Sequence, residues 1–153
     1  MTVSYMVGDM IVEIKKALKE GRPQAFAHGA NCRKIMGAGI AGALARAFPE
    51  VPAADMLSNG TQKFTEAYLG GGVFVYNLYT QYQPGANFEL SRLKAAVEAL
   101  EGTGLKAFTI PKIGAGIGGG DWNEIEKVLQ ESKIHFNVVV LSPLEVPQRS
   151  RPE

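Results

Sequence analysis

Two glycine-rich stretches of the chain satisfy the pattern G-x-G-x-x-G. The first reads MGAGIAGAL over residues 36–44, and the second reads IPKIGAGIGGGDW over residues 110–122. Glycine carries no Cβ atom, so phosphate oxygens can come close to its backbone N–H groups. Two such loops at neighbouring strand ends would form one crevice, where open α/β sheets bind their ligands. The sequence therefore predicts a diphosphate held between two loops; the alternative is that the glycines serve only tight turns and close packing.

Two common phosphate-binding motifs, the P-loop and the Rossmann dinucleotide site, need further residues that neither loop supplies. A P-loop requires Lys-Ser or Lys-Thr after its final glycine, and neither stretch supplies it. A dinucleotide site of the Rossmann type needs an acid about 20 residues further on, at the end of the next strand. The second stretch has no acid there, and Asp55, after the first, lies on no convincing strand. P-loop hydrolysis of nucleoside triphosphates is therefore excluded, and a nicotinamide-dependent oxidoreductase is the weaker alternative.

Three side chains beside the loops are candidates for acid–base or electrostatic chemistry. His28 ends a short apolar stretch before the first loop, and histidine titrates near neutrality, so it is a candidate nucleophile or general base. Asp121 could orient a water molecule, and Lys112 could supply positive charge. Each has a structural alternative, namely a strand-end residue for His28, a helix N-cap for Asp121 and a surface charge for Lys112. Cys32 is better explained as an inert thiol, because no base accompanies it.

Alternating strands and helices must position these residues. Apolar and β-branched runs predict strands at residues 3–7, 25–28, 73–80, 106–111 and 137–141. Helical spacing of apolar residues predicts helices at residues 11–20, 40–48, 90–100 and 121–132. Residues 51–69 are expected to hold a short helix and a loop. The alternation predicts one α/β domain over residues 1–144 with a mostly parallel sheet between helices, and a frayed polar tail at 145–153.

Composition restricts the classes of function. The chain has 153 residues, 46% of them apolar and 20% charged, and a net charge of +1, so bulk attraction to nucleic acid or an anionic membrane is not indicated. One cysteine and two distant histidines supply too few ligands for a metal site, and we expect neither a metal nor a cofactor. No signal peptide and no run of roughly 18 apolar residues is present. We expect a monomeric cytoplasmic protein.

Four stretches together resemble the macro domain, an ADP-ribose-binding module. They are GDM after the first strand, AHGANCRKIMGAGIAGALARAFP, VYNLYTQ and IPKIGAGIGGGDW, and they follow the family's order over about residues 7–141. Within the family, the chain is most similar to the branch of ADP-ribose-1''-phosphate phosphatases and terminal ADP-ribose glycohydrolases, which includes antitoxins that strip ADP-ribose from DNA. The resemblance implies a three-layer α/β/α sandwich with a mixed, mostly parallel sheet.

The resemblance also implies roles for individual residues. Asp9 would accept a hydrogen bond from the adenine amino group, helped by the backbone of Met10 and Ile11. Asn31 would contact the hydroxyl groups of the distal ribose. The residues expected to bind the diphosphate and the distal ribose are Gly37, Ala38, Gly39, Ile40, Ala41, Gln81, Lys112, Gly114, Ala115, Gly116, Ile117, Gly118 and Gly119.

One departure from the family bears on the reaction. Gln81 stands where several glycohydrolases of this branch carry a catalytic lysine, and glutamine cannot form the covalent link with the opened ribose. His28, in contrast, occupies the position of a histidine of the phosphatase-like members. The prediction is therefore an ADP-ribose-1''-phosphate phosphatase with His28, Asn31 and Asp121 as catalytic residues. The alternatives are a reader that binds ADP-ribose without chemistry, and a lysine-free glycohydrolase acting on ADP-ribosylated protein or nucleic acid.

Overall fold

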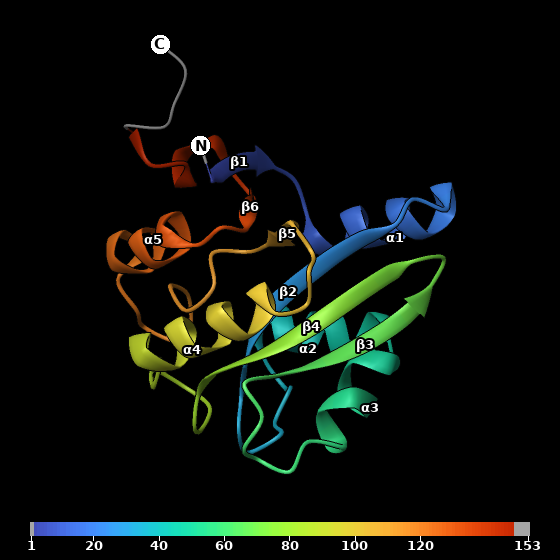
Figure 1. Cartoon of the computed structure of the whole chain (residues 1–153), viewed down its shortest axis with the longest axis horizontal. Coiled ribbons are helices and arrows are strands. Elements are labelled where there is room, and N and C mark those ends of the chain that lie inside the picture. The colour runs from blue at the N-terminus through green and yellow to red at the C-terminus, as the bar shows by residue number, and fades with distance from the viewer. Residues whose placement is uncertain (1, 149–153) are drawn as a thin grey trace.

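Helices lie on both faces of one six-stranded sheet in the computed structural model, which describes residues 2–148 (Figure 1). The strand order is β1-β6-β5-β2-β4-β3, and every neighbouring pair is parallel except the antiparallel pair β3–β4. The strands are β1 (Val3–Val7), β2 (Gln24–Asn31), β3 (Phe64–Gly70), β4 (Val73–Gln81), β5 (Ala107–Ile110) and β6 (His135–Val140). The predicted mixed, mostly parallel sheet is confirmed.

The helices form the two outer layers. They are α1 (Met10–Glu20), α2 (Gly39–Ala47), α3 (Glu50–Met56), α4 (Leu90–Glu101) and α5 (Trp122–Glu131), with a short 3₁₀ helix at Pro143–Glu145. Side chains of α1, α2 and α3 share one hydrophobic core with the sheet, and those of α4 and α5 share the other. Figure 1 shows α4 in front of the sheet and α2 behind it. This arrangement confirms the three-layer sandwich.

The central strand β4 is buried between these layers. It pairs with β2 on one side and β3 on the other, and each of its residues from 75 to 80 is buried. Its side chains alternate between the two cores, with Val75 on the α1–α3 side and Leu78 on the α4–α5 side. Burying one such side chain stabilises the fold by about 1.5–3 kcal/mol. The central strands therefore have a fixed register, and their ends have fixed positions.

The edge strand β3 is not predicted from the sequence. Residues 51–69 are expected to hold a short helix and a loop, whereas the structure has α3 followed by β3. Ala67 is the buried member of β3, so the segment lacks the apolar alternation that predicts a half-buried strand. Pairing with β4 decides its conformation. At β2 the difference is one of length, because the strand continues to Asn31 instead of ending at residue 28.

The predicted tail begins as ordered structure. Ser142 caps the 3₁₀ helix with a capping box, and Val146 packs against the core formed by α4 and α5. Residues 149–153 of the tail lie outside the described residues, and the domain boundary at residue 144 stays a prediction.

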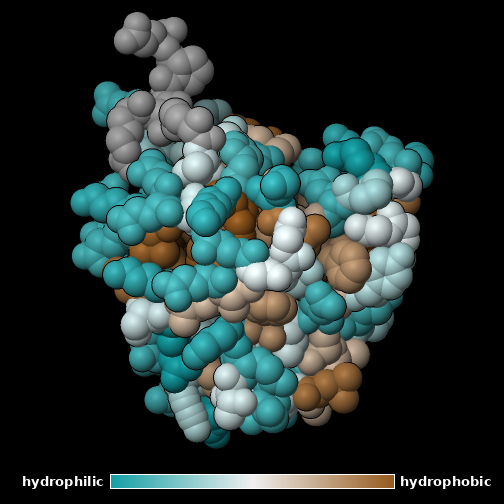
Figure 2. All heavy atoms as spheres, in the orientation of Figure 1, coloured by the Kyte–Doolittle hydropathy of each residue, from teal (hydrophilic) through white to brown (hydrophobic). Residues whose placement is uncertain are grey.

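The face of the molecule seen in Figure 1 is predominantly polar. Figure 2 shows hydrophilic side chains over most of the face seen in Figure 1, with apolar atoms in separate smaller areas. Among the described residues, no helix is both long and apolar enough to cross a membrane. Residues 2–148 also contain no group of three or more His, Cys, Asp or Glu side chains that could hold a metal ion.

Candidate functional site

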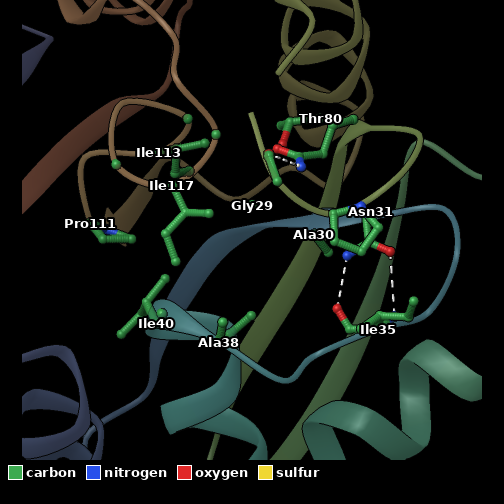
Figure 3. A pocket seen from close by; sticks show the side chains of 18 of the residues that line it. Gly29, Ala30, Asn31, Ile35, Ala38, Ile40, Thr80, Pro111, Ile113 and Ile117 are labelled. Carbon is green, nitrogen blue, oxygen red and sulfur yellow. Dashed lines mark hydrogen bonds between the residues drawn. The ribbon is translucent and has the colours of Figure 1, made fainter. Parts of the chain in front are cut away.

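A cavity of about 410 Å³ opens at the carboxyl ends of β2, β4 and β5 (Figure 3). The ends of β2 and β4 line it, together with residues from three loops at positions 35–41, 84–85 and 111–118. Both glycine loops therefore contribute to one pocket. Parallel strands that end at the same edge of the sheet place it there, as in other open α/β sheets.

The structure divides the predicted site residues into two groups. Those that line the pocket are Asn31, Gly37, Ala38, Gly39, Ile40, Ala41, Gln81, Lys112, Gly114, Gly116, Ile117 and Gly118. Those that do not line it are Asp9, Met10, Ile11, His28, Ala115, Gly119 and Asp121. Lining residues that the sequence analysis misses are Gly29, Ala30, Ile35, Thr80, Pro84, Gly85, Pro111 and Ile113. Two of these had a sequence signal, since the Pro84-Gly85 pair marks a turn shortly after the strand predicted at residues 73–80.

The first loop leads directly into the amino terminus of α2. The N-cap residue, Ala38, has no side-chain group to bond the first turn. The N–H groups of Gly39, Ile40 and Ala41 accordingly donate no hydrogen bond within the described chain. Unpaired N–H groups and the positive end of the helix dipole favour an anion at this position. The first loop can therefore hold a phosphate group.

The second loop is not a helix amino terminus, unlike the first. Helix α5 begins only at Trp122, after the loop has folded back on itself through Gly119 N–H to Gly116 O at 3.1 Å and Gly120 N–H to Gly114 O at 2.7 Å. The N–H groups of residues 116–118 donate no hydrogen bond among the described residues. This loop can offer backbone donors to a ligand but no helix dipole.

The ring of Phe88 explains why several positions of the second loop are glycine. A Cβ atom at Gly114 would overlap this ring, and one at Gly120 would lie 2.6 Å from it. Gly114 also has a backbone φ of 78°, which residues with a Cβ atom rarely adopt. Gly37 and Gly116 differ, because a Cβ atom at either would meet nothing within 4 Å. The glycines thus have two roles, since some make room for Phe88 and others leave space in the pocket.

The two loops come into contact across the pocket. A Cβ atom on Gly39 would lie 2.9 Å from the Cδ1 atom of Ile117, a side chain that is 58% exposed. Figure 3 shows Ile117 directed from the second loop toward Ile40 of the first. This side chain narrows the space between the loops.

His28 lies in the interior, beneath the pocket. Its side chain is completely buried, and its Nε2 atom lies 2.6 Å from Oδ1 of Asn77. The amide of Asn77 has a defined orientation, because its Nδ2 donates to the carbonyl of Val51 at 3.2 Å and to Thr65 Oγ1 at 3.1 Å. Oδ1 can only accept, so the Nε2 atom of His28 carries the proton. Burial lowers the pKa of His28, against the opposing effect of the Asn77 hydrogen bond, and favours the neutral ring.

The same hydrogen bonds continue to a buried carboxyl group. Thr65 Oγ1 lies 2.9 Å from the hydroxyl of Tyr79, which donates to Asp55 Oδ1 at 2.7 Å. Burial raises the pKa of Asp55, and it raises the pKa of Tyr79 to about 12. Asp55 is therefore a structural group of α3, tied to β3 and β4 behind the pocket.

Asn31 shapes the turn after β2 and also lines the pocket. Its Nδ2 donates to the carbonyl of Ile35 at 2.8 Å, and its Oδ1 accepts from the N–H groups of Arg33 at 3.1 Å and Ile35 at 3.3 Å (Figure 3). Asparagine commonly bonds the backbone of a turn, and Asn31 combines this role with a position on the pocket wall.

Two predicted aspartates are helix caps. Asp121 Oδ1 accepts from the N–H of Asn123 at 2.9 Å, and Asp9 Oδ1 accepts from the N–H of Ile11 at 2.8 Å. The structural alternative for Asp121 is thus confirmed, and its catalytic role stays a prediction. Lys112 lines the pocket, with its Nζ atom 5.7 Å from the ring centre of Trp122.

Comparisons with known proteins agree with one another on the family and on the fold. The macro domain family model matches residues 27–129. The protein of Enterobacteria phage T4 described as "Uncharacterized 17.5 kDa protein in tk-vs intergenic region" is 37% identical over 160 residues, with 94% of this chain and 99% of that protein covered. The macrodomain of Mycobacterium tuberculosis DarG has a TM-score of 0.71 at 22% identity, covering 92% of this chain and 98% of that one. Thermosipho africanus DarTG in complex with ADP-ribose has a TM-score of 0.63 at 19% identity, covering 98% of this chain and 43% of that one.

The buried neutral histidine predicts a loss of stability in acid. The unfolded chain binds a proton at His28 near its ordinary pKa of 6.5, whereas the folded chain binds it only at lower pH. The free energy of unfolding should therefore have its full value above pH 6.5. As the pH is lowered from 6.5, it should decrease by up to about 1.4 kcal/mol per pH unit. Urea unfolding between pH 7.5 and 5 measures this. The variant His28→Gln should show a flatter profile, while His135→Gln should keep the decline; equal profiles for His28→Gln and the wild type would contradict the assignment.

The two glycine roles predict effects of different size on stability. Gly114→Ala places a Cβ atom on the Phe88 ring at a positive φ and should cost about 2–4 kcal/mol of unfolding free energy. Gly116→Ala enters open space and should change it by no more than about 0.5 kcal/mol. Chemical denaturation distinguishes them, and similar losses in both variants would show that Phe88 does not set the requirement.

Proposed function

The chain belongs to the macro domain family, and on that premise we propose that its pocket binds ADP-ribose. The observation that carries the proposal is the cavity between two glycine loops, both of which present N–H groups without hydrogen-bond partners in the described chain. A diphosphate needs several such donors in one place. The Thermosipho africanus protein noted above has the same fold and was solved with ADP-ribose.

The diphosphate is the part of the ligand with the strongest physical support. The amino terminus of α2 supplies three N–H groups and the helix dipole on one side, and residues 116–118 supply N–H groups on the other. Lys112 is the charged residue among the described lining residues. The ligand is therefore bound chiefly by backbone donors, which recognise an anion without a cluster of cationic side chains.

The two ends of the ligand extend from the diphosphate in opposite directions. Asp9 lies at the carboxyl end of β1, on the same edge of the sheet as the pocket. Its Oδ1 caps α1, so its Oδ2 is left to accept a hydrogen bond from the adenine amino group, beside Met10 and Ile11. The distal ribose lies at Asn31, at the end of β2.

The geometry supports binding better than the reaction that the sequence predicts. Of the three residues predicted to be catalytic in an ADP-ribose-1''-phosphate phosphatase, only Asn31 lines the pocket. His28 is buried and bonded to Asn77, and Asp121 caps α5. The phosphatase and the lysine-free glycohydrolase stay predictions, and the proposed function is recognition of ADP-ribose.

Filling the open positions of the loops should weaken ADP-ribose binding. Gly116→Val and Gly37→Val each place a Cβ atom where no other atom lies within 4 Å, so the fold should persist while the cavity shrinks. We expect each variant to bind ADP-ribose at least about tenfold more weakly, which equals about 1.4 kcal/mol. Isothermal titration calorimetry measures the affinity. Ala53→Val, at an exposed position of α3, is the matched control. No measurable binding of ADP-ribose by the wild type would overturn the proposal.

Phosphate release distinguishes recognition from catalysis. Incubation of the wild type with ADP-ribose-1''-phosphate should produce no phosphate above that of an Asn31→Ala variant, because no histidine or carboxylate side chain lines the described pocket. Turnover that is lost in His28→Gln but kept in Asp121→Asn, which retains a capping side chain, would instead support a phosphatase that depends on the histidine.

A further inference from the structure

Two carboxamide side chains, Asn31 and Gln81, lie side by side where β2 and β4 end. The strands are in register from Gln24 to Ala30, and a bulge then leaves Thr80 without a partner and sets Asn31 opposite Gln81. The N–H of Cys32 donates to the carbonyl of Gln81 at 3.1 Å and holds the strand ends together. Both residues line the pocket.

The carboxamide of Gln81 has a defined orientation. Its Nε2 donates to the carbonyl of Gln83 at 2.7 Å and to that of Gly85 at 2.9 Å. Carbonyl oxygens only accept, so both N–H groups are used in closing the loop after β4. The Oε1 atom accepts no hydrogen bond in the described part of the chain, and a Cβ atom on Gly118 would lie 3.1 Å from it. Gln81 therefore presents an acceptor against the second glycine loop, on the pocket wall.

Asn31 supplies the complementary donor. Its Oδ1 already accepts two hydrogen bonds from the turn, and one N–H of Nδ2 is used by Ile35. One N–H remains for a ligand. The pair thus offers one uncharged donor and one uncharged acceptor, which together suit hydroxyl groups, because a hydroxyl both donates and accepts.

A phosphate group does not suit this end of the pocket. Phosphate oxygens accept only, and they would face the lone pairs of Gln81 Oε1. Arg92, which could supply positive charge nearby, does not line the pocket, and its guanidinium is bonded to Glu89 at 2.7 Å and to Cys32 Sγ at 3.5 Å. Lys112 belongs to the other wall, at the start of the second loop.

We infer that Gln81, together with Asn31, makes the site selective for a ribose terminus with free hydroxyl groups over a phosphorylated one. The inference rests on the proposed ADP-ribose site and names the form of the ligand that it takes. Setting this acceptor against an anion, where a hydroxyl group would donate to it, should give a preference of about ten- to a hundredfold.

Calorimetry with three ligands tests the selectivity. ADP reports on the shared diphosphate, ADP-ribose adds the hydroxylated ribose, and ADP-ribose-1''-phosphate adds the anionic terminus. The wild type should bind ADP-ribose at least about tenfold more tightly than the 1''-phosphate. This comparison needs no variant, so it does not depend on the folding of a mutant.

Substitutions at Gln81 separate its donor from its acceptor. Gln81→Lys keeps donors for the two loop carbonyls but removes the acceptor, so the preference for ADP-ribose should disappear. Gln81→Glu keeps the acceptor oxygen, replaces the two N–H donors to the loop by a second carboxylate oxygen and adds a negative charge, so the preference should persist or grow. Gln83→Lys and Gln83→Glu place the same charges on an exposed neighbour whose side chain is not part of the loop closure, and both should keep the wild-type ratio.

The outcomes distinguish the inference from the proposed function. Binding of ADP and ADP-ribose with no preference over the 1''-phosphate, or an unchanged preference in Gln81→Lys, would overturn the inference and leave the ADP-ribose site standing. No binding of any of the three ligands by the wild type would overturn both. A preference that Gln81→Lys abolishes and Gln83→Lys retains supports the inference.

Discussion

The parallel pairing of β2 with β4 is the constraint on which the whole site depends. Both strands run through the buried centre of the sheet, so the two hydrophobic cores fix their register. That register sets His28 opposite Asn77 in the interior and, after the bulge, Asn31 opposite Gln81 at the pocket. A slip of one residue would turn these side chains to the other face of the sheet and remove both arrangements.

The interior behind the pocket is polar, and its groups depend on one another. His28, Asn77, Thr65, Tyr79 and Asp55 form one chain of hydrogen bonds from β2 to α3. A buried polar group left without its partner costs about 1–3 kcal/mol, so each of these bonds stabilises the buried groups that it joins. These hydrogen bonds tie α3 and β3 to the central strands β2 and β4, and they hold the His28 ring in the interior.

The two glycine loops look alike in sequence but differ physically. The first loop begins a helix, and its bare backbone leaves N–H groups for an anion. The second packs over Phe88, and part of its glycine content makes room for that ring. A shared G-x-G-x-x-G pattern therefore has two causes here, namely access for a ligand and close packing against an aromatic side chain.

The sequence by itself determined the order of the elements and the place of the loops, because hydrophobic spacing, helix caps and glycine positions are local properties. Tertiary structure alone decided which side chains reach the pocket. His28 is held in the interior by a hydrogen bond to Asn77, which is 49 residues away along the chain. Position 114 must be glycine because the ring of Phe88, from another loop, occupies the space of a Cβ atom. The edge strand β3 likewise exists because β4 pairs with it. Burial and register join residues that are distant along the chain, and no local pattern carries that information.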